Sequence, residues 1–277
     1  MRPNNILLLL AEACDEHRLT NTDLTHIRIE SLDLDFSDKP GPNNILYVNQ
    51  LDVPKNLSSK TKETVPKLEI SLVETNTDLV PGVYEGGFKI WECSYDLLSY
   101  LQDINISGYL SATNVLDLGC GSGLPGILCA LSGSNSVTFQ DYNADVIKGV
   151  TIPNYWANLG NGKDLSCKPQ FYSGPWDTFC NSIKKYEKSY DLILTSETIY
   201  NTSHYSSLIN IFDYCLSLNG TVLLAAKVNY FGVGGGLRQF ENALDAINKE
   251  LPKWVYKTVK VQGEHVKREI IEIKRVL

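Results

Sequence analysis

The sequence has few of the residues that would suggest a metal centre, a disulfide framework or a membrane segment. Its seven cysteines are scattered without a Cys-x-x-Cys pair, and its four histidines are equally dispersed. This pattern predicts reduced thiols, no metal site and no serine or cysteine catalytic triad. The apolar run at residues 6–11 is too short for a secretory signal or a membrane span. We therefore expect a protein of the cytoplasm and nucleus that binds no membrane.

Basic residues are also fewer than acidic residues. There are 25 Lys and Arg against 32 Asp and Glu, which gives a formal net charge of −7 and a pI near 5.2. A surface of this sign argues against direct binding of nucleic acid and is compatible with a basic protein partner. The length of 277 residues and the 43% hydrophobic content suffice for one large domain and an appendage. We expect a monomer.

A glycine-dense turn is the most informative feature that is present. An apolar segment runs into Gly119, Gly121 and Gly123, and a helix starts near Pro125. Glycines let the backbone turn sharply and approach a ligand, while the start of a helix offers free N–H groups. The spacing Gly121-x-Gly123-x-x-Gly126 also satisfies the dinucleotide fingerprint. The turn therefore predicts a nucleotide-cofactor loop, for either a nicotinamide cofactor or S-adenosylmethionine.

Two carboxylates favour S-adenosylmethionine. Asp117 precedes the first glycine by two residues and suits a ligand that carries an ammonium group better than one that carries a pyrophosphate. Asp141 ends the next apolar segment about 20 residues after the glycines, where doubly wound folds place the acid that holds ribose hydroxyls. Tyr142 beside it could cover the adenine. The alternative is that both aspartates cap helices or turns.

The chain divides into two parts by composition. Residues 1–66 are acidic and rich in Asn, Asp, Ser, Thr and Pro, with little periodicity, which predicts an irregular or partly disordered N-terminal arm. Residues 67–277 predict the folded domain. Its first segment, 67–75, alternates apolar and polar residues as a half-buried strand does.

From residue 114 onward, strand and helix patterns alternate. We predict strands at 114–118, 136–140, 168–172, 190–195 and 221–228, with helices at 91–104, 125–132, 143–159, 203–217 and 236–250. Such alternation predicts a mostly parallel α/β sheet covered on both faces. Residues 255–261 and 269–276, joined through Gly263 without a helix, predict an antiparallel hairpin. A Rossmann-like sheet with this C-terminal hairpin is the seven-strand layout of S-adenosylmethionine-dependent methyltransferases.

Six stretches of sequence carry a resemblance to a known family. They are Gly86-Gly87-Phe88-Lys89-Ile90-Trp91-Glu92-Cys93-Ser94, the loop at 117–123, Gln140-Asp141-Tyr142-Asn143, Gly174-Pro175-Trp176, Ser196-Glu197-Thr198-Ile199-Tyr200-Asn201 and the segment 226–236. In this order they resemble the protein-histidine methyltransferases of the methyltransferase-like group, over residues 80–277.

The resemblance implies a cofactor, an acceptor and a set of contacts. The acceptor in that family is a histidine of a basic large-subunit ribosomal protein. Together with Asp117 and Gly121 from the loop, the cofactor contacts it implies are Ile90, Trp91, Glu92, Cys93, Ser94, Gly119, Gln140, Asp141, Tyr142, Gly174, Pro175, Trp176 and Ser196.

One position departs from related lysine-modifying enzymes. Those relatives typically carry Asp-x-x-Tyr after the fourth strand, where this chain has Glu197-x-x-Tyr200. A histidine is already mostly neutral at pH 7 and needs little base strength, but its ring must be oriented and its developing charge accepted. We expect Glu197, Tyr200 and Asn201 to perform this catalytic role.

Other interpretations stay open at this point. Trp91 and Trp176 could be core residues, Glu92 a first-turn helix acid, and His204 a solvent-facing helix residue. The glycine-rich segment 232–236 is either a flexible loop or a place where a peptide backbone comes close. A methyltransferase of lysine or another acceptor, a catalytically silent scaffold and a nicotinamide dehydrogenase remain alternatives to histidine methylation.

Overall fold

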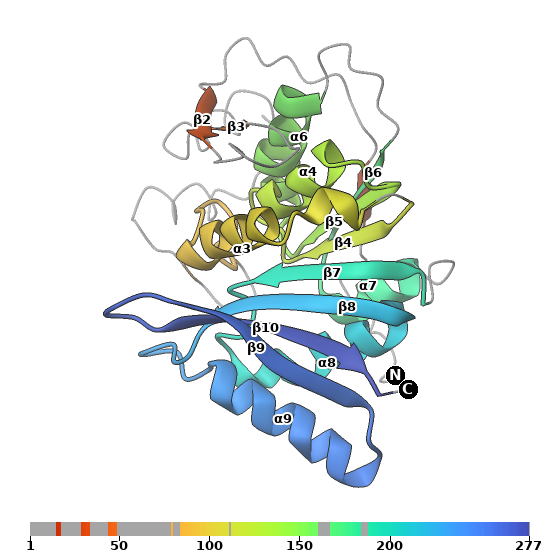
Figure 1. Ribbon diagram of the computed structural model, residues 1–277. Helices are drawn as coiled ribbons and strands as arrows, with labels where there is room; N and C mark the ends of the chain where they lie inside the picture. Colours follow the sequence, from red (N-terminus) through yellow and green to blue (C-terminus); the bar gives the residue numbers. More distant parts are fainter. Residues whose placement is uncertain are drawn as a thin grey trace, which may run out of the picture.

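A computed structural model gives the arrangement of the chain (Figure 1). It describes residues 15–17, 29–33, 44–48, 79, 84–110, 112–159, 167–183 and 188–276. The strand predicted at 67–75 and most of the predicted N-terminal arm lie outside these residues. Within the arm, β1 (Asp15–His17), β2 (Ile29–Asp33) and β3 (Asn44–Val48) are described. The boundary at residue 66 stays a prediction.

The main sheet has the strand order β1-β6-β5-β4-β7-β8-β10-β9. Its parallel centre consists of β4 (Asn114–Leu118), β5 (Ser136–Asp141), β6 (Lys168–Ser173), β7 (Tyr190–Ser196) and β8 (Leu216–Lys227). β9 (Trp254–Gln262) and β10 (Arg268–Arg275) form the antiparallel hairpin, and β10 pairs with β8. Strands β4 to β10 match the seven strands predicted from residue 114 onward. The predicted parallel sheet with a C-terminal hairpin is confirmed.

Two further pairings involve the arm. β1 lies antiparallel to β6 at the far edge of the sheet, with Glu16 opposite Tyr172. β2 and β3 form a separate two-stranded antiparallel sheet.

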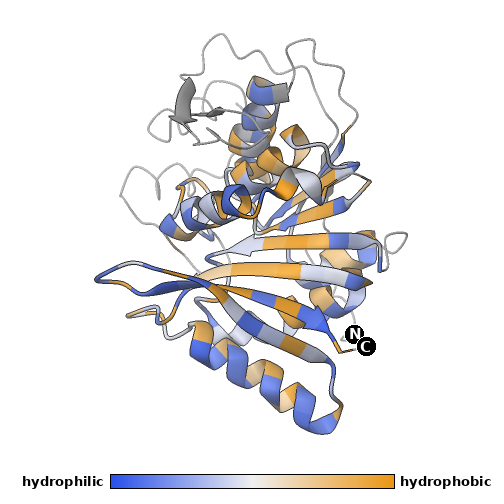
Figure 2. Cartoon of the chain, viewed as in Figure 1, coloured by the Kyte–Doolittle hydropathy of each residue, from blue (hydrophilic) through white to orange (hydrophobic). Residues whose placement is uncertain are grey.

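Helices cover both faces of the sheet. On one face lie α3 (Glu92–Asp103), α4 (Leu124–Leu131) and α6 (Ile152–Leu159), and on the other α7 (Trp176–Ser182), α8 (Tyr205–Cys215) and α9 (Leu237–Glu250). Neighbouring residues of β4 show the period of two, since Val115 packs with the first group and Leu116 with the second. Figure 2 shows the apolar central strands, while α9 alternates polar and apolar residues because one of its sides faces solvent.

The predicted helix at 143–159 is interrupted. It consists of α5 (Ala144–Val146), a π-helical turn η3 (Ile147–Thr151) and α6. Pro153 follows this turn and cannot donate a backbone hydrogen bond to it, which favours the wider turn. Two short 3₁₀ turns, η2 (Ile106–Gly108) and η5 (Thr202–His204), complete the described helical elements.

One predicted boundary was wrong, and one helix was not predicted. β8 begins at Leu216 instead of residue 221, because the segment before Gly220 pairs with β7 at Tyr190. α7 was not predicted, since seven residues are too few to show a helical period. No helix among the described residues is long and apolar enough to cross a membrane.

Candidate functional site

A cavity of about 700 Å³ opens at the sheet edge where the parallel strands end. Carboxyl ends of parallel strands meet at one edge, so loops distant in sequence converge there. We call the lining formed by residues 119–122, 141–142 and 174–177 the glycine-loop half. The lining formed by residues 85–94, 196–200 and 227–233 is the Glu197 half.

The glycine-loop half is shaped by backbone conformation. Gly119 has a φ of 63°, in the left-handed region, and a Cβ added to it would lie 2.6 Å from Cγ2 of Thr198. Gly121 has a φ of 50° and its N–H donates to Asp141 Oδ2 at 2.9 Å. Only glycine combines this backbone with so close an approach. The sharp turn expected from the sequence is present.

Asp141 lies at the cavity and braces the loop. Besides Gly121, its carboxylate accepts the N–H of Asn143 at 3.0 Å. Burial raises the pKa of Asp141 to about 6, against the lowering effect of these hydrogen bonds. Its place at the end of β5 is the one in which doubly wound folds hold ribose hydroxyls.

Asp117 is placed differently from Asp141. Its side chain is 3% exposed, does not line the cavity, and accepts the N–H of Gly126 at 2.9 Å. Burial raises its pKa to about 8. A Cβ on Gly126 would come within 2.9 Å of this carboxylate. Asp117 therefore lies beneath the loop and holds the start of α4, instead of facing the ligand space.

Gln140 ties three segments together from beneath the cavity. Its Oε1 accepts from Trp176 Nε1 at 3.0 Å and from the N–H of Gly119 at 3.4 Å, while its Nε2 donates to the carbonyl oxygen of Gly174 at 2.8 Å. The side chain is fully buried. Its hydrogen bond to Nε1 orients the indole of Trp176, which lines the cavity. That ring is nearly perpendicular to the ring of His204, exposed in η5, with 6.3 Å between the centroids.

The remaining predicted cofactor residues separate into two groups. Trp91, Ser94, Tyr142, Gly174, Pro175 and Ser196 line the cavity, whereas Ile90, Glu92 and Cys93 do not. Ile90 and Cys93 are buried in the core. Within the lining, Ser94 Oγ lies 2.9 Å from Ser196 Oγ. Strand order alone could not show which side chains of a contiguous stretch face inward.

Glu197 is the central carboxylate of the Glu197 half. It is 9% exposed, has a φ of 60° and donates its N–H to the carbonyl oxygen of Ala225 at 3.0 Å. Its Oε1 accepts the N–H of Cys93 at 3.4 Å and lies 3.6 Å from Lys227 Nζ. A non-glycine residue in the left-handed region is uncommon and costs energy, so the surrounding contacts must impose it.

Of the two neighbouring residues Tyr200 and Asn201, only Tyr200 lines the cavity. Tyr200 lines the cavity, and its hydroxyl donates to Glu85 Oε2; burial, and then this carboxylate, raise its pKa above the ordinary value. Asn201 does not line the cavity. Its Oδ1 accepts from the N–H and hydroxyl of Ser203, at 3.0 and 2.8 Å, as the cap of η5. The structure thus brings Glu197 and Tyr200 together but leaves Asn201 outside.

Sequence reasoning missed Lys227, Tyr230 and Glu85 as cavity residues. Lys227 ends β8, next to β7, so its strand-end position was the available signal. Tyr230 and Glu85 lie in loops, where no periodicity shows which side chains face inward.

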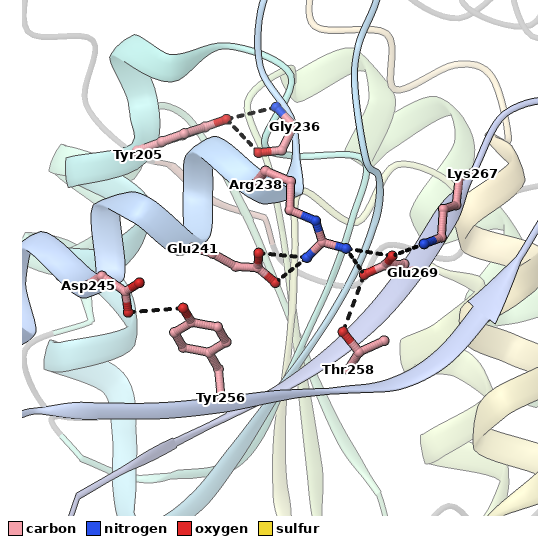
Figure 3. Close-up of polar contacts among 9 residues, drawn as sticks. All are labelled: Tyr205, Gly236, Arg238, Glu241, Asp245, Tyr256, Thr258, Lys267 and Glu269. Atoms are coloured by element: carbon pink, nitrogen blue, oxygen red, sulfur yellow. Dashed lines mark hydrogen bonds and ion pairs between the residues drawn. The ribbon is translucent and has the colours of Figure 1, made fainter.

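The loop between β8 and α9 is held in place by hydrogen bonds, as Figure 3 shows. The hydroxyl of Tyr205 accepts the N–H of Gly236 at 2.9 Å. The same hydroxyl donates to the carbonyl oxygen of Ile199 at 3.0 Å. Arg238 contacts Glu241 and Glu269 at 2.6 Å each. Tyr205 therefore fixes the end of this loop against the segment that carries Tyr200.

Among the described residues, no group of three or more His, Cys, Asp or Glu side chains is placed to hold a metal ion. The cavity is lined by a glycine loop that follows β4, in the parallel centre of a sheet whose strands β4 to β10 end in an antiparallel hairpin. This fold and site define a Rossmann-like methyltransferase.

Comparison with known proteins narrows the class. A family model described as "Lysine methyltransferase" matches residues 82–231. The chain is 40% identical over 266 residues to the histidine protein methyltransferase 1 homolog of Bos taurus, covering 80% of this chain and 70% of the relative. It is 48% identical over 197 residues to the homolog of Dictyostelium discoideum, covering 71% and 60%. It is 31% identical over 263 residues to histidine protein methyltransferase 1 of Saccharomyces cerevisiae, covering 73% and 67%.

The chain therefore belongs to the histidine protein methyltransferase family, and it is a methyltransferase. The matched region spans 60% of the Dictyostelium relative, 70% of the Bos taurus relative and 67% of the Saccharomyces relative.

Proposed function

We propose that this protein transfers a methyl group from S-adenosylmethionine to a histidine side chain of a basic protein, of the large-subunit ribosomal class. The observation that carries the proposal is the Glu197 carboxylate, held by the N–H of Cys93 in the same cavity that the glycine loop lines. The similarity to relatives named histidine protein methyltransferase 1 homolog supports the choice of acceptor.

The glycine-loop half fits S-adenosylmethionine. Gly119 and Gly121 line the cavity with left-handed backbone that can approach a ligand closely, and the Asp141 carboxylate suits ribose hydroxyls. The half-buried ring of Trp176 offers a face for a flat base. When bound, S-adenosylmethionine supplies a methyl group on a sulfonium sulfur, which departs as a neutral thioether when a nitrogen lone pair attacks the methyl carbon.

The Glu197 half fits a neutral nitrogen. A lysine with a pKa near 10.4 must lose a proton first, at a cost of about 4 to 5 kcal/mol at pH 7, whereas an imidazole near 6.5 is already mostly neutral. The imidazole becomes cationic as it accepts the methyl group, and a nearby carboxylate stabilises that charge. Glu197 can accept the ring N–H, orient the ring and offset the charge.

Protein is the acceptor class that the rim supports. Phe231 and Val233 line the mouth of the cavity and are 84% and 48% exposed. Exposed apolar side chains at a cavity mouth suit contact with another protein. The net charge of −7 supports a basic partner. Action as a monomer, without direct nucleic acid contact, in the cytoplasm and nucleus belongs to the same proposal.

The test uses S-adenosylmethionine labelled in its methyl group, incubated with the protein and a ribosomal protein extract. Acid hydrolysis and amino-acid analysis then show which residue carries the label. We expect methyl-histidine in the basic large-subunit fraction. Label only in methyl-lysine would contradict the histidine assignment and leave the methyltransferase assignment standing.

The pH profile gives a second check. Because a neutral imidazole is the reactant, turnover should rise through about pH 6.5 and then flatten. A lysine acceptor would make it climb toward pH 10. Initial rates of label transfer between pH 5.5 and 9.5 distinguish the two.

A further inference from the structure

We infer that Lys227 selects the acceptor: its own ammonium group occupies the place in the cavity where the ammonium group of a lysine acceptor would bind. The inference rests on the proposed function. It adds a reason why the protein methylates histidine and not lysine.

The surroundings of Lys227 Nζ form an ammonium site. Glu92 Oε2 lies 3.1 Å away and Glu197 Oε1 3.6 Å away. The ring centroids of Trp91 and Tyr230 lie 5.2 and 5.8 Å from the same nitrogen. Carboxylates and aromatic faces at these distances are the groups with which proteins bind alkylammonium ions. The site that could hold a substrate lysine is thus filled from within.

The Lys227 side chain is also fixed in this place. It comes from the last residue of β8, next to the end of β7 that carries Glu197, and its side chain is 17% exposed. The backbone N–H of Lys227 donates to the hydroxyl of Tyr230 at 3.3 Å. The residue is therefore held at both its backbone and its ammonium end.

The charge on Lys227 is permanent at physiological pH. Burial by itself would lower the pKa of this ammonium group, but Glu197 and Glu92 outweigh burial and hold the pKa above its ordinary value. A second ammonium group brought to Glu197 would meet a like charge and find the carboxylate already paired. A neutral imidazole meets no such repulsion and can donate its N–H to the Glu197 carboxylate.

Emptying the site is the direct test. In Lys227→Met the charge is removed while the length of the chain is nearly kept, and in Lys227→Arg the charge stays. With labelled S-adenosylmethionine and the ribosomal protein extract, we expect the ratio of methyl-lysine to methyl-histidine to rise at least about 10-fold in Lys227→Met. Lys227→Arg should keep the wild-type ratio. An unchanged ratio in Lys227→Met, or an equal rise in Lys227→Arg, would overturn the inference.

A binding measurement covers the case in which Lys227→Met makes no product. The double variant Lys227→Met/Glu92→Gln removes one charge of each sign, so Glu197 is left to pair with an added cation. We expect n-butylammonium to bind either variant at least about 10-fold more tightly than it binds wild type or Lys227→Arg, as measured by ligand-observed NMR with S-adenosylhomocysteine present. Equal binding in all four proteins would refute the inference.

The two proposals fail separately. If wild type forms no methyl-histidine, the proposed function is wrong whatever n-butylammonium does. If wild type forms methyl-histidine and the emptied site neither binds n-butylammonium nor accepts lysine, only the role of Lys227 is wrong.

Discussion

The two halves of the cavity are built in different ways. The glycine-loop half presents the backbone of its glycine turn together with the Asp141 carboxylate and the Trp176 ring, and the buried side chains Asp117 and Gln140 hold that backbone from beneath without lining the cavity. The Glu197 half presents side chains, whose charged groups pair with one another inside the cavity.

The difference follows from what each half must do. Backbone N–H groups and glycines give a surface that changes little when side chains move, which suits a ligand that is always the same. Paired side chains set charge and orientation, which decide between acceptors and act on the reacting atoms. Substitutions should therefore separate the halves, affecting affinity in one and turnover or selectivity in the other.

The largest effect is expected for Glu197→Gln. Glutamine keeps the shape and can still accept the N–H of Cys93, but it loses the charge that stabilises a cationic imidazole. Turnover should fall about 100-fold or more, while the affinity for S-adenosylhomocysteine stays within about threefold. Label transfer and calorimetry measure the two quantities. Glu272→Gln, on the hairpin, is the control and should change neither. An equal loss of affinity would place Glu197 in the cofactor site.

A smaller effect, on affinity, is expected for Gly119→Ala. The left-handed backbone of Gly119 costs about 1 to 2 kcal/mol for a residue with a Cβ, and the added atom would come within 2.6 Å of Thr198. S-adenosylhomocysteine should bind about 10- to 30-fold more weakly by calorimetry. Gly108→Ala is the matched control, because nothing lies within 4 Å of its added Cβ. If both variants bind like wild type, the loop does not contact the cofactor.

A third effect, on stability instead of ligand binding or turnover, concerns the pH dependence of the ligand-free protein. Burial raises the pKa of Asp117 from 3.8 to about 8, so the folded state favours its neutral form. The corresponding stability is complete below about pH 4 and is lost as pH rises through about 8. Asp117→Asn is neutral at every pH and can still accept the N–H of Gly126.

Wild type should therefore lose stability relative to Asp117→Asn by up to about 1.4 kcal/mol per pH unit between pH 4 and 8. Urea unfolding at several pH values measures this difference. Asp177→Asn, at an exposed position, is the control variant. If the difference in stability between wild type and Asp117→Asn is constant with pH, Asp117 is charged in the folded protein. It would then again be a candidate to bind the ammonium group of the ligand.

Much of the glycine-loop half could be predicted from local sequence. The turn at Gly119, Gly121 and Gly123 needs left-handed backbone that glycine alone adopts freely, and the flanking strand and helix show their own periods. The same local signals predicted the hairpin at Gly263, which has a φ of 84°. Local sequence did not show whether the Asp117 side chain faces the ligand or lies beneath the loop.

The Glu197 half depended on contacts between distant segments. Cys93 and Glu197, which share a hydrogen bond, are 104 residues apart, and Glu85 and Tyr200 are 115 apart. Lys227 joins Glu92 and Glu197 only because β8 lies beside β7 and α3 begins above them.

Local sequence thus determined strands β4 to β10, most helices, the glycine turn and the resemblance to a family, since periodicity and backbone preference act over a few residues. Tertiary structure alone decided that Asn201 caps a turn outside the cavity, that Gln140 joins three loops, and that Lys227 is paired inside it. The physical reason is that side-chain direction and charge pairing in loops are set by packing against segments about a hundred residues away, which no local pattern records.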